Sequence, residues 1–156
     1  MLDWTDVFLR LTVATFVGGA IGVNRDLRGK PTGVRTMGIV ALGSAAIVLA
    51  SQYPARATDA AAASRVMQGI ITGIGFLGAG VILRNPGGGR VRGMTTAASI
   101  WLTACIGASC GAGAWPIVLI SAVLVALVLA FGKTVERAFE RSIGQIDPDD
   151  EGGTPG

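Results

Sequence analysis

The side chains in this sequence that could do chemistry are mostly hydroxyls and arginines. One face of an expected helix carries only small or weakly polar residues at helical spacing: Thr96, Ser99, Thr103, Gly107 and Cys110. This face predicts one of two structures. It either packs against a neighbouring helix, with its hydroxyls bonded to their own helix backbone, or forms the wall of a polar cavity.

A second candidate is Arg10, which lies within an apolar run. Charged groups inside membrane segments are rare and become functional candidates once a partner is named. Asp6 stands four residues earlier on the same helix face and would form an ion pair with Arg10. The alternative is that the Arg10 side chain extends to the lipid headgroups at the membrane surface.

Further arginines stand at the ends of apolar runs: Arg25 and Arg35, then Arg84 and Arg92. There they would set the orientation of the helices and bind anionic lipid, at about 1 kcal/mol for each residue. The alternative is a paired basic mouth for an anion or for an acidic protein surface. Arg35 and Thr36 begin a helix, where backbone N–H groups favour anions.

Several classes of function are disfavoured by what the sequence lacks. It contains no His, no Ser/His/Asp set, no cluster of metal ligands and no close carboxylate pair, so we expect neither an enzyme nor a metal or other cofactor. Cys105 and Cys110 fall on different helix faces and are expected to be buried thiols. The net charge of +3 sits at the ends of apolar runs, which argues against nucleic-acid binding.

The elements that would position these residues are membrane helices. Of the 156 residues, 51% are hydrophobic and 15% are charged, and the mean hydropathy is +0.59. Each helical crossing of a bilayer needs about 20 mostly apolar residues. The sequence therefore predicts an all-α bundle of five crossings, at 7–23, 36–52, 65–83, 95–113 and 116–132. One domain, 1–143, would end in an interfacial helix, and a disordered tail would cover 144–156.

The basic residues also predict the orientation of these crossings. Ten of the 13 Lys and Arg residues form three clusters, which follow the first, third and fifth spans. The positive-inside rule makes these clusters cytoplasmic, so the N-terminus lies outside and the C-terminus inside. Trp4, Tyr53 and Trp115 fall at the outer ends of spans, where aromatic rings anchor in the interface.

The chain matches itself without gaps at an offset of 60 residues. Gly18 corresponds to Gly78 and Thr36 to Thr96, and both loop and apolar positions match. This pattern predicts that the first two spans repeat as the third and fourth, like the parallel repeats of some transporters. Chance matching between two Gly- and Leu-rich segments is the alternative.

Glycine patterns predict which helices approach closely. The third expected span is the richest, and its glycines form two faces: Gly69, Gly73 and Gly80, then Gly75 and Gly78. Small faces allow close packing in a membrane, so we expect this span at the centre of the bundle. In the first span, Gly18 and Gly22 form a further close-packing pair.

Motifs in both halves of the chain resemble the MgtC/SapB family of inner-membrane proteins. The stretches that carry the resemblance are Gly18–Gly22 with Arg25, Gly33–Thr36, Gly73–Ile82 and Val91–Ala98. Trp101 and Gly107 fit the family's fourth helix. The resemblance covers most of residues 10–113.

The resemblance implies an inner-membrane domain of several helices that is associated with magnesium limitation and, in pathogens, with survival inside host cells. Many members carry a soluble C-terminal domain, which we expect this chain to lack. The family has Glu at the end of the first span where this sequence has Asn24, and a family Gln falls on Gly69, one position after Gln68. A polar site built from those groups would be altered or shifted here.

Magnesium transport by the chain itself is disfavoured by its residues. Mg²⁺ prefers carboxylate and water oxygens, yet the deep parts of the expected spans hold no Asp or Glu, and arginines would repel a cation. We therefore expect a non-enzymatic protein that acts through a membrane-protein partner, with membrane lipids as further contacts and a second copy of the chain as a candidate partner. The alternative is a small-solute or ion transporter with a polar site between the two repeats.

Overall fold

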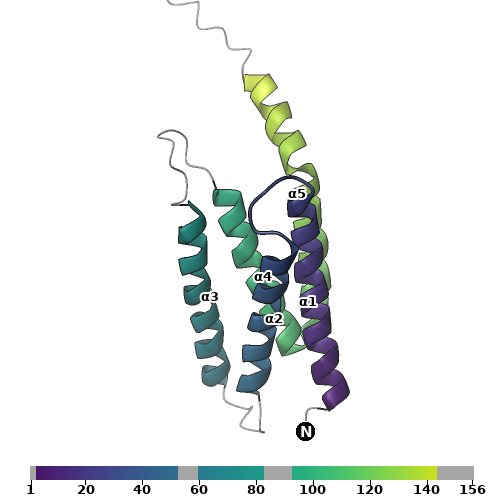
Figure 1. The fold of residues 1–156 in the computed structure, drawn as a ribbon, viewed down its shortest axis with the longest axis vertical. Coiled ribbons are helices and arrows are strands. Elements are labelled where there is room, and N and C mark those ends of the chain that lie inside the picture. Colours follow the sequence, from purple (N-terminus) through teal and green to yellow (C-terminus); the bar gives the residue numbers. More distant parts are fainter. Residues whose placement is uncertain (1–2, 53–59, 83–92, 144–156) are drawn as a thin grey trace, which may run out of the picture.

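The structure is a computed structural model that describes residues 3–52, 60–82 and 93–143, with side-chain contacts as far as Gly132. The described residues form five helices and no strand: α1 (Trp4–Asp26), α2 (Val34–Ser51), α3 (Ala60–Ile82), α4 (Met94–Ala112) and α5 (Trp115–Ile143). Successive helices run in opposite directions along one axis, and α5 continues beyond the ends of the others (Figure 1). The all-α bundle is the predicted fold class.

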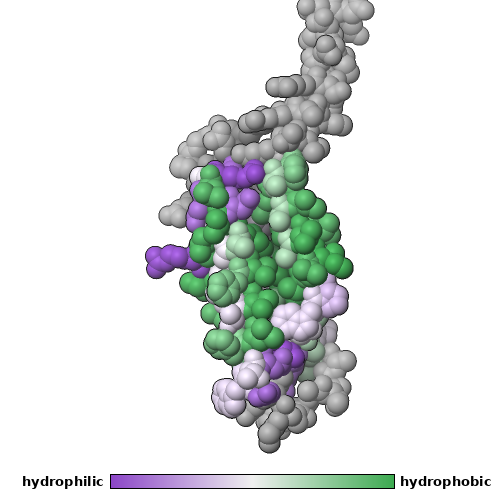
Figure 2. Space-filling model, turned by 90° about the vertical axis from the view of Figure 1, so that its right-hand side faces the viewer, coloured by the Kyte–Doolittle hydropathy of each residue, from purple (hydrophilic) through white to green (hydrophobic). Residues whose placement is uncertain are grey.

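Most of these helices have the length and the hydropathy of membrane spans. Four of them, α1, α2, α3 and α5, are long and apolar enough to cross a bilayer. One face of the molecule shows a broad apolar belt with hydrophilic side chains at both ends (Figure 2), as lipid surroundings require. The fifth helix, α4, has 19 residues and lies among the other helices, and its crossing stays a prediction.

The centre of the bundle is α4, and the expectation that the third span would be central is wrong. Helix α4 contacts each of the other four helices, whereas α3 contacts only α2 and α4. Along residues 61–82 of α3, only Gly78 is buried. Where a Cβ would stand on the other glycines of α3, no atom lies within 4 Å: Gly69, Gly73, Gly75 and Gly80. Small side chains permit close approach, but they do not by themselves decide which helix is surrounded.

Close approach occurs instead around α2, which lies between α1 and α4. A Cβ on Gly18 of α1 would stand 2.6 Å from the Met37 carbonyl oxygen, and one on Gly22 would stand 2.5 Å from the Cα of Val34. On the other side of α2, a Cβ on Gly111 of α4 would stand 2.5 Å from the carbonyl oxygen of Ala45. The paired small residues on α1 and α4 thus bring three backbones together.

In each of the two hairpins predicted from the repeat, residues at equivalent positions face each other. Gly18 faces Met37 in the α1–α2 hairpin, and 60 residues later Gly78 faces Ala97 in the α3–α4 hairpin, with 3.5 Å from a Gly78 Cβ to that of Ala97. Helices α1 and α3 run in the same direction, as do α2 and α4 (Figure 1). This arrangement agrees with the repeat, but alternate helices of any antiparallel bundle run in the same direction, so the repeat stays a prediction.

The ends of α4 are set by glycine. Gly93 before it has φ +97°, and Gly113 after it has φ +74°, a region that L side chains rarely adopt. After α4 the chain turns back on itself, because the Gly113 N–H donates to the Cys110 carbonyl and the Ala114 N–H donates to the Ser109 carbonyl. These bonds direct the chain from α4 into α5.

Candidate functional site

The most unusual polar group in the described part of the chain is Arg25, near the end of α1. Its side chain is buried, with 3% of the residue exposed. Its Nη1 donates to Ser99 Oγ at 3.0 Å and its Nη2 donates to Thr96 Oγ1. Both acceptors belong to α4, so a charged side chain from the first hairpin binds the hydroxyls of the second.

The hydroxyl face of α4 serves both packing and this arginine. Ser99 Oγ donates to the Thr95 carbonyl at 2.6 Å, and Thr103 Oγ1 donates to the Ser99 carbonyl at 2.7 Å, as the packing interpretation predicts. Thr103 is fully buried and also lies 3.5 Å from Met37 Sδ. The face is therefore occupied by α1 and α2.

The turn that joins α1 to α2, residues 27–33, covers Arg25 from the end of the bundle. The Pro31 carbonyl accepts from Arg25 Nη2 at 3.2 Å and from Nε at 3.4 Å. The next residue, Thr32, has φ +65°, an unfavourable conformation for a β-branched residue. The Asp26 carboxylate accepts from the Val34 N–H at 3.0 Å and so fixes the start of α2.

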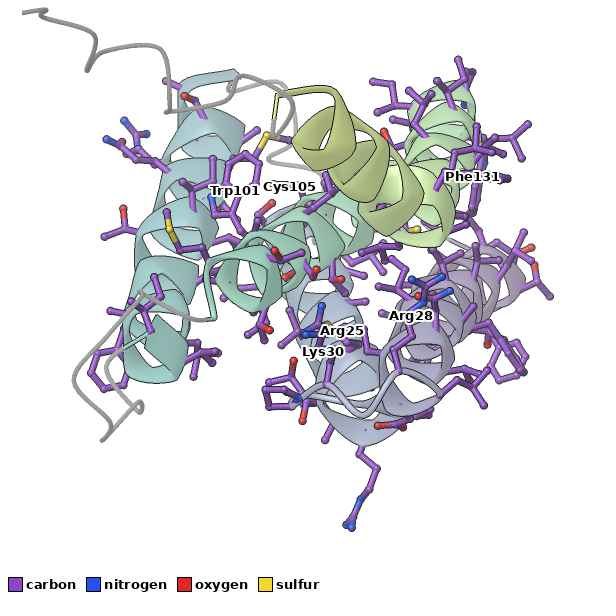
Figure 3. The ribbon with its side chains drawn as sticks, turned by 90° about the horizontal axis from the view of Figure 1, so that it is seen from above. Arg25, Arg28, Lys30, Trp101, Cys105 and Phe131 are labelled. Atoms are coloured by element: carbon purple, nitrogen blue, oxygen red, sulfur yellow. The ribbon has the colours of Figure 1, made fainter. Side chains whose placement is uncertain are left out.

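Three basic residues gather at this end of the bundle. Arg25, Arg28 and Lys30 lie around α1 and the α1–α2 turn when the molecule is viewed from above (Figure 3). Arg28 Nη2 donates to the Ala130 carbonyl of α5 at 3.2 Å. Together Arg25 and Arg28 tie the end of α1 to both α4 and α5.

The other predicted residues of this region do not join Arg25 in a common site. Arg35 and Thr36 are exposed, although Thr36 is the repeat counterpart of the buried Thr96. Gln68 is also exposed and lies in the first half of α3, toward the opposite end of the bundle (Figure 1). Asn24 is partly buried, and its Oδ1 has no hydrogen-bond partner among the described residues. Arg84 and Arg92 lie outside the described residues, so the paired basic mouth stays a prediction.

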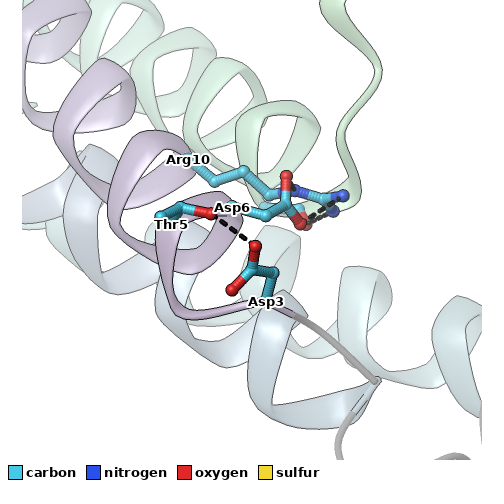
Figure 4. A network of polar contacts seen from close by, with 5 residues as sticks. Asp3, Thr5, Asp6 and Arg10 are labelled. Atoms are coloured by element: carbon cyan, nitrogen blue, oxygen red, sulfur yellow. Dashed lines mark hydrogen bonds and ion pairs between the residues drawn. The ribbon is translucent and has the colours of Figure 1, made fainter.

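At the opposite end of the bundle, Arg10 binds Asp6. The Arg10 Nη2 lies 2.8 Å from Asp6 Oδ2, and the Arg10 Nε donates to Asp6 Oδ1 at 3.0 Å (Figure 4). Arg10 Nη1 also donates to the Gly111 carbonyl at 3.0 Å, near the end of α4. The side chain pairs as the first interpretation predicts, instead of extending to the lipid headgroups.

Some contacts of these two arginines were missed in the sequence. Pro31 and Gly111 contribute backbone carbonyls, and the residue type gives no sign of such a contact.

Both cysteines are free thiols. In the described part of the chain, no three His, Cys, Asp or Glu side chains lie close enough to hold a metal ion.

Comparison with known proteins agrees with this membrane bundle. The model of the MgtC family matches residues 11–138. The chain belongs to the MgtC family. SrpB of Synechococcus elongatus is 43% identical over 144 residues, which cover 86% of this chain and 79% of SrpB. No solved structure is significantly similar to the chain.

Two further relatives are longer than this MgtC-family chain. YhiD of Escherichia coli K12 is 37% identical over 130 residues, which cover 80% of this chain and 59% of YhiD. MgtC of Salmonella typhimurium is 39% identical over 117 residues, which cover 75% of this chain and 48% of MgtC. The chain therefore spans about half the length of these two proteins.

Proposed function

We propose that this MgtC-family chain is a non-enzymatic inner-membrane protein that acts in magnesium homeostasis or low-magnesium adaptation through a partner in the membrane. The family resemblance and the provisional name of YhiD as a magnesium transporter support the link to magnesium. The residues inside the bundle support a regulator, that is, a protein that acts through a partner and does not itself transport magnesium.

The observation that carries the proposal is the sign of the charge in the packed interior. Among the described residues, the buried polar or charged side chains are Arg25, Ser44, Thr96, Ser99 and Thr103. The one charge in this set is positive, and it would repel a cation that moved through the bundle. Thr96 and Ser99 already accept bonds from Arg25, so they offer less to a passing ion.

A partner has a candidate surface on α3. Its glycines at 69, 73, 75 and 80 have no neighbour within 4 Å of a Cβ, and small residues are typical of helix interfaces in membranes. A helix of another membrane protein, or of a second copy, could approach there. The double variant Gly69→Leu/Gly73→Leu would block that approach. The matched control is Gly43→Leu on α2, where no atom lies within 4 Å of a Cβ either.

The proposed sidedness follows from the basic residues at the Arg25 end. Lys and Arg favour the cytoplasmic side, so this end would face the cytoplasm, with the N-terminus outside. Labelling single introduced cysteines in intact cells tests it, after Cys105→Ala and Cys110→Ala remove the two native thiols. A cysteine at exposed Lys30 should be protected from an impermeant reagent, whereas one at exposed Asp3 should react.

The deciding experiment combines cell growth with reconstitution. The α3 double variant should remain folded, lose a crosslinked membrane partner and fail to support growth at low magnesium, whereas the Gly43 variant should behave like the parent. The second candidate is a small-solute or ion transporter, which the predicted repeat of two hairpins favours. Saturable magnesium flux into vesicles that hold only this protein would establish transport and overturn the regulator.

A further inference from the structure

No acidic side chain forms an ion pair with Arg25 among residues 3–52, 61–82 and 93–132, whose side chains the structure describes. The partners of Arg25 there are the neutral oxygens of Thr96, Ser99 and Pro31. The neighbouring carboxylate, Asp26, instead accepts from the Val34 N–H. A buried charge without a counter-charge is costly, and an anion would relieve that cost.

The Nε/Nη2 edge of the guanidinium forms longer hydrogen bonds, to Pro31, than the Nη1/Nη2 edge forms to Ser99 and Thr96. Nε and Nη2 form the planar fork that normally binds two oxygens of a carboxylate or phosphate. Here Nε and Nη2 both donate to one oxygen, that of Pro31, at 3.4 Å and 3.2 Å, longer than the usual charge-assisted bond, while Nη2 also donates to Thr96 Oγ1. The fork thus holds a poor substitute for an oxyanion.

The backbone that supplies this oxygen lies in a turn with unfavourable geometry. Thr32, directly after Pro31, has φ +65°, and Gly29 has φ +59°. A movement of the Pro31 carbonyl away from Arg25 would allow Thr32 to leave this unfavourable conformation and relieve its strain. A second basic residue lies next to Pro31 in the chain, because Lys30 directly precedes it and is exposed, whereas Arg28 donates to the Ala130 carbonyl of α5.

We propose that the Nε/Nη2 edge of Arg25 binds a phosphate group, which takes the place of the Pro31 carbonyl while Lys30 adds a second positive charge. The phosphate group belongs either to an anionic lipid headgroup or to free phosphate, since both offer the same oxygens. This site goes beyond the proposed function and does not depend on it. Thr96 and Ser99 keep the other side of the guanidinium fixed.

Thermal unfolding of the purified full chain in a neutral maltoside detergent tests the site. One arm adds inorganic phosphate at constant ionic strength against chloride and acetate, and the other adds phosphatidylglycerol against phosphatidylcholine. A saturable rise in Tm is expected with phosphate, with phosphatidylglycerol or with both. Arg25→Lys keeps the charge but loses the fork, so the apparent Kd should rise about tenfold.

Two further variants keep the test decisive. Arg35→Gln removes an exposed arginine at the same end and should change the Kd by less than about twofold, because surface charges act weakly. Lys30→Gln, also exposed, should raise the Kd about threefold through the lost charge, and decides the matter if Arg25→Lys does not fold.

A response confined to phosphate assigns the site to the free ion, and one confined to phosphatidylglycerol assigns it to lipid. No saturable rise in either arm, or an equal rise with acetate, would overturn the proposal. So would an unchanged Kd in folded Arg25→Lys, or equal effects of Lys30→Gln and Arg35→Gln.

Discussion

Gly107 of α4 lies so close to Ala41 of α2 that a Cβ on Gly107 would stand 2.3 Å from the Ala41 carbonyl oxygen. Ala41 is also the residue that Gly18 of α1 approaches from the other side, at 2.7 Å from a Gly18 Cβ to the Ala41 Cβ. Three helices therefore meet at one alanine. These contacts set how closely α1 and α4 approach α2.

Replacing Gly107 by Ala should destabilise the bundle. The added methyl group meets backbone atoms of α2, which cannot turn aside as a flexible side chain could, so α2 and α4 must separate. We expect the free energy of unfolding to fall by about 1–3 kcal/mol, measured by unfolding in mixed detergent micelles.

Gly43→Ala is the matched control on α2, because no atom lies within 4 Å of a Cβ at that position. Its effect should stay within about 0.5 kcal/mol. Equal losses in the two variants would show that glycine composition, and not the α2–α4 contact, governs stability.

The sequence predicted the helices well and their arrangement less well. Long apolar runs located all five helices, because a bilayer imposes both length and composition on a crossing. The central position was assigned to the third span because it has the most glycines. The centre is α4, where Gly107 and Gly111 stand four residues apart; that spacing was present in the sequence and carried the better signal.

The bond from Arg25 to Thr96 can be tested by comparing Thr96 with Thr36, its counterpart in the repeat. Thr96→Ala leaves one guanidinium N–H of the buried Arg25 without its acceptor, and should lower the free energy of unfolding by about 1.5–3 kcal/mol, the range for hydrogen bonds to charged groups. Thr36→Ala changes the corresponding residue of the first hairpin, which is exposed. It should cost less than about 0.5 kcal/mol, and a similar loss at Thr36 would contradict the described site.

For this site, the sequence predicted the participants but not the pairing. Arg25 was a candidate for binding anions or lipid, and Thr96 and Ser99 were candidates as part of the small, weakly polar face. That Arg25 binds α4 while Arg35 stays exposed depends on the rotation of each helix about its axis. Side-chain packing sets that rotation, and the repeat alone could not distinguish Thr36 from Thr96.

The α1–α2 turn allows a test of backbone strain by a pair of opposite changes. Thr32 and Gly29 both have positive φ angles, +65° and +59°. Thr32→Gly should raise the free energy of unfolding by about 0.5–1 kcal/mol because glycine tolerates this region. Gly29→Ala should lower it by about 1–2 kcal/mol, although a Cβ there meets no atom within 4 Å. Changes of the same sign in both variants would refute the described turn.

The last prediction concerns the ion pair between Arg10 and Asp6. The Arg10 side chain is 17% exposed and the Asp6 side chain is 33% exposed, so solvent weakens their attraction only in part. A double-mutant cycle with Arg10→Gln and Asp6→Asn should give a coupling energy of about 1 kcal/mol, which falls as salt is added. Arg10→Gln should cost more than Asp6→Asn, because it also removes the bond to the Gly111 carbonyl at 3.0 Å. Asp3→Asn at the exposed start of α1 is the control, and a coupling energy near zero would mean that Arg10 spends its time at the lipid headgroups.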